Sequence, residues 1–137
     1  MIAVDTSALM AILLDEPAAA DCITVLASEE HLVISAGTVA EALIVAARRG
    51  VSEEMVRMVD GLGFEVAPVT TATARQIAEA YAQWGKGSHP AGLNFGDCFA
   101  YAIAKERACR LLFVGDDFLQ TDVEAAIPAA AAPDSTT

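Results

Sequence analysis

The chain opens with Met1-Ile2-Ala3-Val4-Asp5-Thr6-Ser7-Ala8-Leu9, where a short apolar run meets a capping signal. The run Met1 to Val4 is typical of a buried strand. The small oxygen-bearing side chains of Asp5-Thr6-Ser7 favour the start of a helix, and the apolar residues that follow predict a helix through about Leu14. A strand that passes directly into a helix is the building unit of parallel sheets.

The same alternation continues along the chain. Apolar runs at 31–35, 64–69 and 111–114 predict three more strands, and the segments 17–28, 38–49, 52–61, 71–84 and 94–108 predict helices. Strands that alternate with helices indicate an α/β fold with a mainly parallel sheet. We expect one domain over residues 1–128, followed by a flexible Ala/Pro/Ser/Thr tail at 129–137.

The composition restricts the class of protein. A chain of 137 residues with a hydrophobic content of 55% is long enough for one domain with a substantial core. Its apolar runs are too short to cross a bilayer, and its N-terminus lacks the positive flank of a secretory signal. We therefore expect a cytoplasmic protein that has no membrane partner.

The net charge is strongly negative. Eight basic residues against nineteen acidic residues give a formal charge of -11 at pH 7. Such a charge repels a phosphate backbone, which argues against a passive nucleic-acid-binding module. A nucleic-acid enzyme stays open, because bound cations reverse the sign of the charge locally. The charge also suits a partner that carries basic residues.

Acidic side chains stand near the junctions between predicted strands and helices: Asp5, Glu41, Asp97 and the pair Asp116/Asp117. Each has an ordinary structural explanation. Asp5 is a good N-cap, and the segments Thr38–Glu41 and Asn94–Asp97 have the spacing of capping boxes whose acid is the third helical residue. The Asp116/Asp117 pair suits a turn after a strand.

Taken together, the acids indicate a metal site. Asp5 and Glu41 both follow a predicted strand, and open α/β sheets bind ligands at the carboxyl ends of their strands. Carboxylates that converge there repel one another unless a cation neutralises them. Oxygen ligands without histidine or cysteine favour Mg²⁺ or Mn²⁺, and such a centre is suited to the hydrolysis of a phosphodiester.

Two other functions fit part of the pattern. A phosphatase or phosphotransfer domain also gathers acids at strand ends, but it needs an Asp-x-Asp arrangement, and Asp5-Thr6-Ser7 lacks the second acid. A binding module would use the acidic surface to hold a basic partner without catalysis. Survival of activity in an Asp5→Ala variant would favour the binding module.

In their order and distances, the motifs resemble those of PIN-domain ribonucleases, and within them the VapC toxins of bacterial toxin–antitoxin pairs. Four segments carry the resemblance: Ile2–Leu9, Thr38–Ala42, Tyr81–Tyr101 and Leu111–Asp122. The first three are similar to the segments that hold the family's first, second and third acids, and the fourth is similar to its closing motif. The resemblance runs from Met1 to about Pro128.

The resemblance implies a three-layer α/β/α fold, a homodimer and Mg²⁺-dependent endonucleolytic cleavage of RNA, with Mn²⁺ as a substitute. It also implies neutralisation by a VapB-type antitoxin, which inserts a C-terminal segment into the toxin's site within a toxin–antitoxin hetero-oligomer. The identity of the RNA is left open, because such specificity lies in loop shape and dimer geometry.

The resemblance also assigns the site residues. Asp5, Glu41 and Asp97 match the family's metal-site acids, and Asp117 is preferred to Asp116 because it directly precedes the closing phenylalanine. All four are expected to act as metal ligands and as catalytic residues. Asp5 and Asp97 would hold Mg²⁺, while Glu41 and Asp117 complete the site or orient the attacking water.

Neighbouring side chains have two interpretations each. Thr6 and Ser7 either cap the first helix or hydrogen-bond the acids or a phosphate. Lys86 and His89 lie in the glycine-rich loop before Asp97, where they either meet an RNA backbone or are simply solvated. Neither loop residue is included among the expected catalytic residues.

Overall fold

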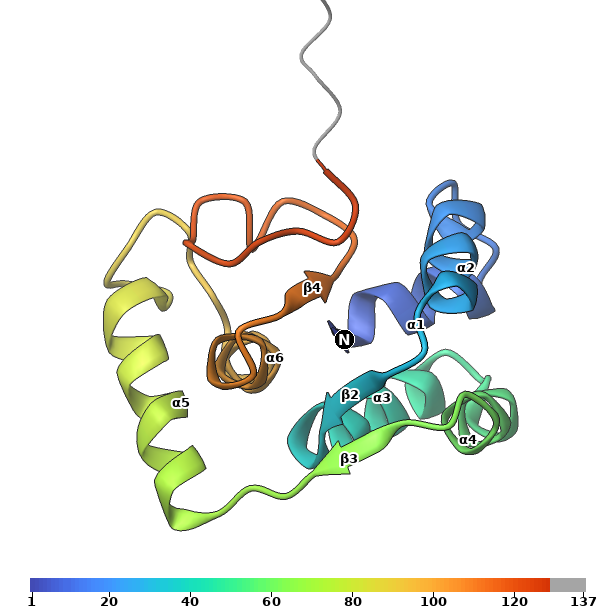
Figure 1. Cartoon of the computed structure of the whole chain (residues 1–137), viewed down its shortest axis with the longest axis horizontal. Helices are drawn as coiled ribbons and strands as arrows, with labels where there is room; N and C mark the ends of the chain where they lie inside the picture. The colour runs from blue at the N-terminus through green and yellow to red at the C-terminus, as the bar shows by residue number, and fades with distance from the viewer. Residues whose placement is uncertain (129–137) are drawn as a thin grey trace, which may run out of the picture.

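The computed structural model describes residues 1–128, and the tail expected at 129–137 lies outside the described residues. At its centre is a sheet of four parallel strands in the order β3-β2-β1-β4 (Figure 1). The strands are β1 (Ile2–Val4), β2 (Leu32–Ser35), β3 (Glu65–Ala67) and β4 (Arg110–Leu112). The register sets Ile2 of β1 between Leu32 of β2 and Arg110 of β4. The predicted α/β fold with a parallel sheet is confirmed.

Six helices in the described part of the chain connect and cover the strands: α1 (Thr6–Leu13), α2 (Ala19–Ser28), α3 (Ala36–Arg48), α4 (Ser52–Gly61), α5 (Thr71–Trp84) and α6 (Phe95–Glu106). Residues of α1 to α4 pack on one face of the sheet, and residues of α5 and α6 pack on the other. The layers are therefore α/β/α. No helix within residues 1–128 is long and apolar enough to span a bilayer.

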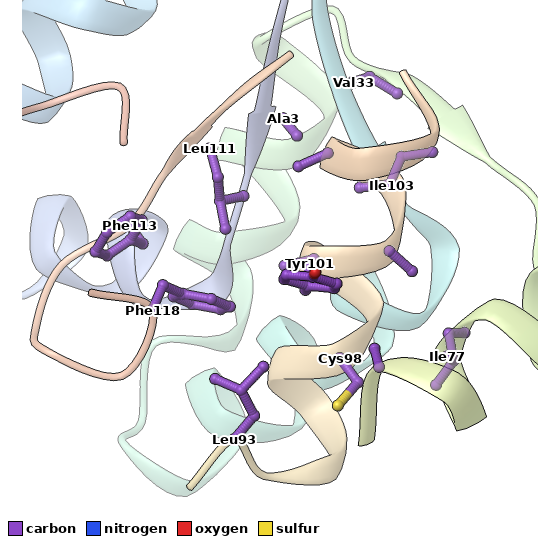
Figure 2. Packing of buried hydrophobic residues seen from close by; sticks show 14 of the residues in the cluster. Ala3, Val33, Ile77, Leu93, Cys98, Tyr101, Ile103, Leu111, Phe113 and Phe118 are labelled. Carbon is purple, nitrogen blue, oxygen red and sulfur yellow. The ribbon is translucent and has the colours of Figure 1, made fainter. Parts of the chain in front are cut away.

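Alternation along the strands divides the core between the two faces. Ala3, Val33 and Leu111 point towards α6, where they meet Tyr101 and Ile103 (Figure 2). Their neighbours Ile2, Val4, Leu32, Ile34 and Leu112 point to the opposite face. Because these strands are short and almost wholly buried, they read as continuous apolar runs, as strands covered on both faces do.

One predicted capping box is wrong. The helix α3 begins at Ala36, two residues earlier than expected, and its N-cap is Ser35, whose Oγ accepts a hydrogen bond from Gly37 N at 3.2 Å. Thr38 therefore lies inside the first turn, and Glu41 lies in the second turn instead of the third helical position. The reason is that β2 ends at Ser35, so the last strand residue itself supplies the capping oxygen.

Several predicted boundaries are also displaced. The helix α2 begins at Ala19 and not at Pro17, while β3 and β4 are shorter than the apolar runs that predicted them. Both strands lie at the edges of the four-stranded sheet, where each pairs with one named strand. Beyond β4, Val114 N donates to the Ser7 side chain and not to a strand.

Candidate metal centre

Asp5 is positioned by the junction between β1 and α1. As the N-cap of α1 it accepts hydrogen bonds at Oδ2 from Ser7 N at 3.1 Å and from Ser7 Oγ at 2.6 Å. Ser7 Oγ in turn accepts from Val114 N at 3.0 Å, which ties this corner to the segment after β4. The carboxylate is only 3% exposed.

The other oxygen of Asp5, Oδ1, is buried without a hydrogen-bond partner in residues 1–128. Burial is the main reason why the pKa of Asp5 rises to about 6, and the hydrogen bonds from Ser7 act in the opposite direction. A buried polar atom without a partner carries a free-energy cost, and a carboxylate oxygen is a hard ligand for a divalent cation. The burial of Asp5 Oδ1 without a hydrogen-bond partner is therefore the observation that best fits a bound metal.

Glu41 approaches Asp5 from α3. Its Oε1 accepts a hydrogen bond of 2.6 Å from Thr6 Oγ1, so the first helix holds this side chain as well. Its Oε2 lies against Gly96 at the start of α6, where a methyl group added to the glycine would overlap the carboxylate. The absence of a side chain at Gly96 therefore lets Glu41 reach the turn that carries Asp97.

Asp97 is the third residue of α6, as predicted. Asn94 N donates to Asp97 Oδ2 at 3.0 Å, and Asp97 N donates to Asn94 Oδ1 at 2.8 Å, which forms the expected capping box. The pKa of Asp97 is raised to about 7, mainly by burial and also by the nearby carboxylates of Asp5, Asp117 and Glu41. The hydrogen bond from Asn94 N lowers this pKa, but its effect is smaller than that of burial.

The Asp116/Asp117 pair is exposed in the loop after β4. Asp117 lies close enough to Asp97 to raise the pKa of that carboxyl. Asp116 instead borders a separate surface cavity together with Asp21 and Leu119. The structure thus brings Asp5, Glu41 and Asp97 together. Of the two loop acids, Asp117 is the one whose charge acts on Asp97.

These acids are near one another but are not arranged as a finished metal cage. In residues 1–128, no group of three or more histidine, cysteine, aspartate or glutamate side chains is placed to hold a metal ion as it stands. The atoms that could bind a metal are nonetheless all carboxylate oxygens. None of these carboxylates takes part in an ion pair with a basic side chain within residues 1–128. The residues therefore fit Mg²⁺ or Mn²⁺.

The structure distinguishes the roles of the neighbouring side chains that the sequence left open. Ser7 and Thr6 hydrogen-bond Asp5 and Glu41, respectively. His89 packs its ring edge-on against Trp84, with centroids 4.7 Å apart, and its Nδ1 accepts from Ala91 N. His89 therefore stabilises its own loop, while Lys86 is exposed. Sequence reasoning missed Gly96, for which the only signal is a glycine beside an acid at a helix start.

The sequence matches the PIN domain family over residues 2–124. Ribonuclease VapC28 of Mycobacterium tuberculosis is 42% identical over 128 residues, which cover 90% of this chain and 96% of that relative. The crystal structure of VapC20 from the same species, a toxin that cleaves the sarcin-ricin loop, superposes with a TM-score of 0.74 at 16% identity, over 90% of this chain and 96% of that one.

A toxin–antitoxin complex from Klebsiella pneumoniae contains a chain with a TM-score of 0.67 at 17% identity, which covers 89% of this chain and 93% of that one. At these low identities, the two solved structures support the fold alone. The relative at 42% identity and the family match extend over nearly the whole described chain.

We expect the metal-free protein to lose stability as the pH rises from about 4 to 7. In this window the folded state keeps a proton on Asp97, whose pKa is about 7, while the unfolded chain has released it near the ordinary aspartate pKa of 3.8. Asn cannot ionise, so at about pH 8 the Asp97→Asn variant should melt roughly 5 °C higher than the wild type. Near pH 4 the variant and the wild type should melt at the same temperature.

Differential scanning calorimetry in EDTA measures this difference. The matched control is Glu124→Gln, which changes an exposed carboxylate outside the centre and should follow the wild type at every pH. Identical pH dependence in the wild type and Asp97→Asn would show that Asp97 carries no raised pKa.

Gly96→Ala should disturb the centre while leaving the helix intact. Alanine is favoured over glycine inside a helix, but here its methyl group displaces the Glu41 carboxylate. We expect the rise in melting temperature on addition of Mg²⁺ to fall by more than half. Gly61→Ala, which places its methyl group in open space on α4, should keep the full rise. Equal responses of the two variants to Mg²⁺ would contradict the role given to Gly96.

Proposed function

Because this chain belongs to the PIN domain family, and within it to the VapC group, we propose that it is a Mg²⁺-dependent endoribonuclease that acts as the toxin of a toxin–antitoxin pair. Relatives that share 42% of their residues with it over nearly their full length are named ribonucleases. The observation that carries the proposal is the buried Asp5 carboxylate, with its unpartnered Oδ1, beside Glu41 and Asp97.

In this proposal Asp5 and Asp97 hold the cation, and Glu41 and Asp117 complete the site or orient the attacking water. A divalent cation bound there supplies the positive charge that offsets the carboxylates and polarises the scissile phosphate. Mn²⁺ should substitute for Mg²⁺, because both accept oxygen ligands in octahedral geometry.

The residues around the acids have positioning roles. Ser7 donates to Asp5 Oδ2 and so leaves Oδ1 free, and Thr6 holds one oxygen of Glu41 while the other faces Gly96. Water then adds to phosphorus, and the bond from phosphorus to the leaving sugar oxygen breaks. One RNA fragment ends in a phosphate monoester and the other in a hydroxyl group.

The charge of the chain fits its proposed partners. At -11, the protein repels free RNA unless a cation is bound, but it attracts a basic segment. We therefore propose that a VapB-type antitoxin neutralises the enzyme through a segment with basic residues. A homodimer within a toxin–antitoxin hetero-oligomer and a cytoplasmic location complete the proposal.

Asp97→Asn should lower the rate of RNA cleavage by on the order of 1,000-fold, since stabilisation by a bound cation is worth several kcal/mol. Sequencing of RNA ends after induction of the wild type and of the variant measures this loss and identifies the RNA. Glu124→Gln serves as the control and should cleave at the wild-type rate.

Two outcomes would refute the proposed function. One is cleavage by Asp97→Asn at the wild-type rate. The other is wild-type cleavage that continues unchanged in EDTA.

A further inference from the structure

The segment that carries Asp117 is a closed loop, here named the closing loop and comprising residues 113–123. It leaves the sheet at the end of β4 and returns beside the same strand. On its return, Leu111 N donates to Glu124 O and Ala126 N donates to Leu111 O, both at 2.8 Å. The two ends of the closing loop are thus fixed to one strand, while its acidic tip is exposed.

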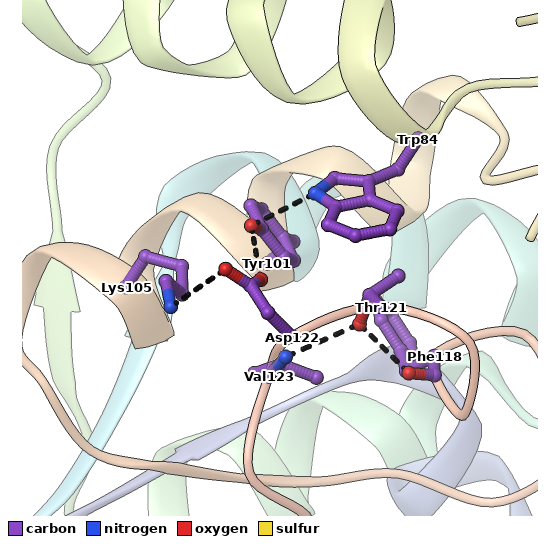
Figure 3. Close-up of polar contacts among 7 residues, drawn as sticks. All are labelled: Trp84, Tyr101, Lys105, Phe118, Thr121, Asp122 and Val123. Atoms are coloured by element: carbon purple, nitrogen blue, oxygen red, sulfur yellow. Dashed lines mark hydrogen bonds and ion pairs between the residues drawn. The ribbon is translucent and has the colours of Figure 1, made fainter. Parts of the chain in front are cut away.

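Inside the closing loop, side chains fix the path of the backbone. Phe118 is 2% exposed and packs on Phe113, with ring centroids 5.0 Å apart. Thr121 Oγ1 donates to Phe118 O at 2.7 Å and accepts from Val123 N at 3.3 Å (Figure 3). The backbone on either side of Asp117 is therefore held by the buried Phe118 ring and by the turn at Thr121.

A hydrogen bond joins the closing loop to α6. Tyr101 OH donates to Asp122 Oδ1 at 2.5 Å, and Trp84 Nε1 donates to the same hydroxyl at 2.9 Å (Figure 3). Because the hydroxyl accepts from Trp84, its own proton is directed to Asp122. Tyr101 is 6% exposed, and Lys105 adds a more exposed ion pair to Asp122 at 3.1 Å.

Tyr101 and Asp97 are one helical turn apart on α6, so the loop that carries the fourth acid is tied to the helix that carries the third. Asp5, Glu41 and Asp97 are each held by a hydrogen bond to a neighbouring residue. The Asp117 side chain has no such partner in residues 1–128, so its place depends on the backbone of the closing loop.

We propose that Tyr101 and Asp122 are positioning residues, whose hydrogen bond fixes the closing loop on α6 and thereby places Asp117 at the cation site. The inference rests on the proposed function and extends it to two residues that touch neither cation nor RNA. Groups that orient the ligands of a metal are commonly worth 10- to 100-fold in affinity.

A double-mutant cycle tests this role, with Mn²⁺ affinity by calorimetry and the RNA cleavage rate as its two measurements. Tyr101→Phe keeps the buried ring and removes only the hydroxyl. It should weaken Mn²⁺ binding about 10-fold when Asp117 is present, and less than about twofold in an Asp117→Ala background. The two effects differ only if Tyr101 acts through Asp117.

Further variants separate the hydrogen bond from general stability. Asp122→Ala should reproduce the loss seen in Tyr101→Phe, and Asp122→Asn should restore most of the affinity because it keeps an oxygen acceptor for Tyr101. Lys105→Met removes only the exposed ion pair and should change Mn²⁺ affinity less than about twofold. The amides of Leu119 and Thr121, which are bonded within the closing loop, should exchange faster in Tyr101→Phe.

Equal losses of affinity in the presence and absence of Asp117 would overturn the inference, because they would show a general loss of stability. Failure of Asp122→Asn to restore affinity beyond Asp122→Ala would do the same. If the wild type binds no Mn²⁺ and Asp97→Asn cleaves as well as the wild type, the proposed function fails, and this inference fails with it. A coupled cycle in an active, Mn²⁺-binding wild type supports both.

Discussion

The rest of the site depends on one carboxylate buried at the end of a central strand. Asp5 is 3% exposed, one of its oxygens is held by Ser7, and the other has no partner in residues 1–128. Glu41 lies close enough to raise the pKa of Asp5, and Asp5 and Glu41 both raise the pKa of Asp97. Such a centre either keeps protons near neutral pH or binds a cation. Without a cation, ionisation of these carboxylates lowers the stability of the folded protein.

The parallel sheet explains why these acids meet. Parallel strands place their carboxyl ends on one edge of the sheet. At this edge Asp5 follows β1, α3 with Glu41 follows β2, and the loop with Asp117 follows β4. Asp97 arrives from the helix that precedes β4. Two glycines allow the close approach of α3 and α6, because Gly37 lies against the Phe99 ring and Gly96 lies against Glu41.

Local sequence signals predicted the strand–helix alternation and the capping box that holds Asp97. The box from Asn94 to Asp97 involves four neighbouring residues, so sequence alone specifies it. The box expected at Thr38 was wrong because Ser35 offers an equally good oxygen, and only the end of β2 decides between them. The nearness of Asp117 to Asp97 depends on Phe118 and on the distant contact between Tyr101 and Asp122, which no periodicity reveals.

The most direct measurement is the anomalous scattering of Mn²⁺ in crystals of the wild type grown at about pH 8, where the carboxylates are ionised. We expect one strong peak in contact with the carboxylates of Asp5 and Asp97, and its loss in crystals of Asp97→Asn. Crystals saturated with Mn²⁺ that show peaks only at exposed surface acids would contradict the claim that these carboxylates form a metal centre.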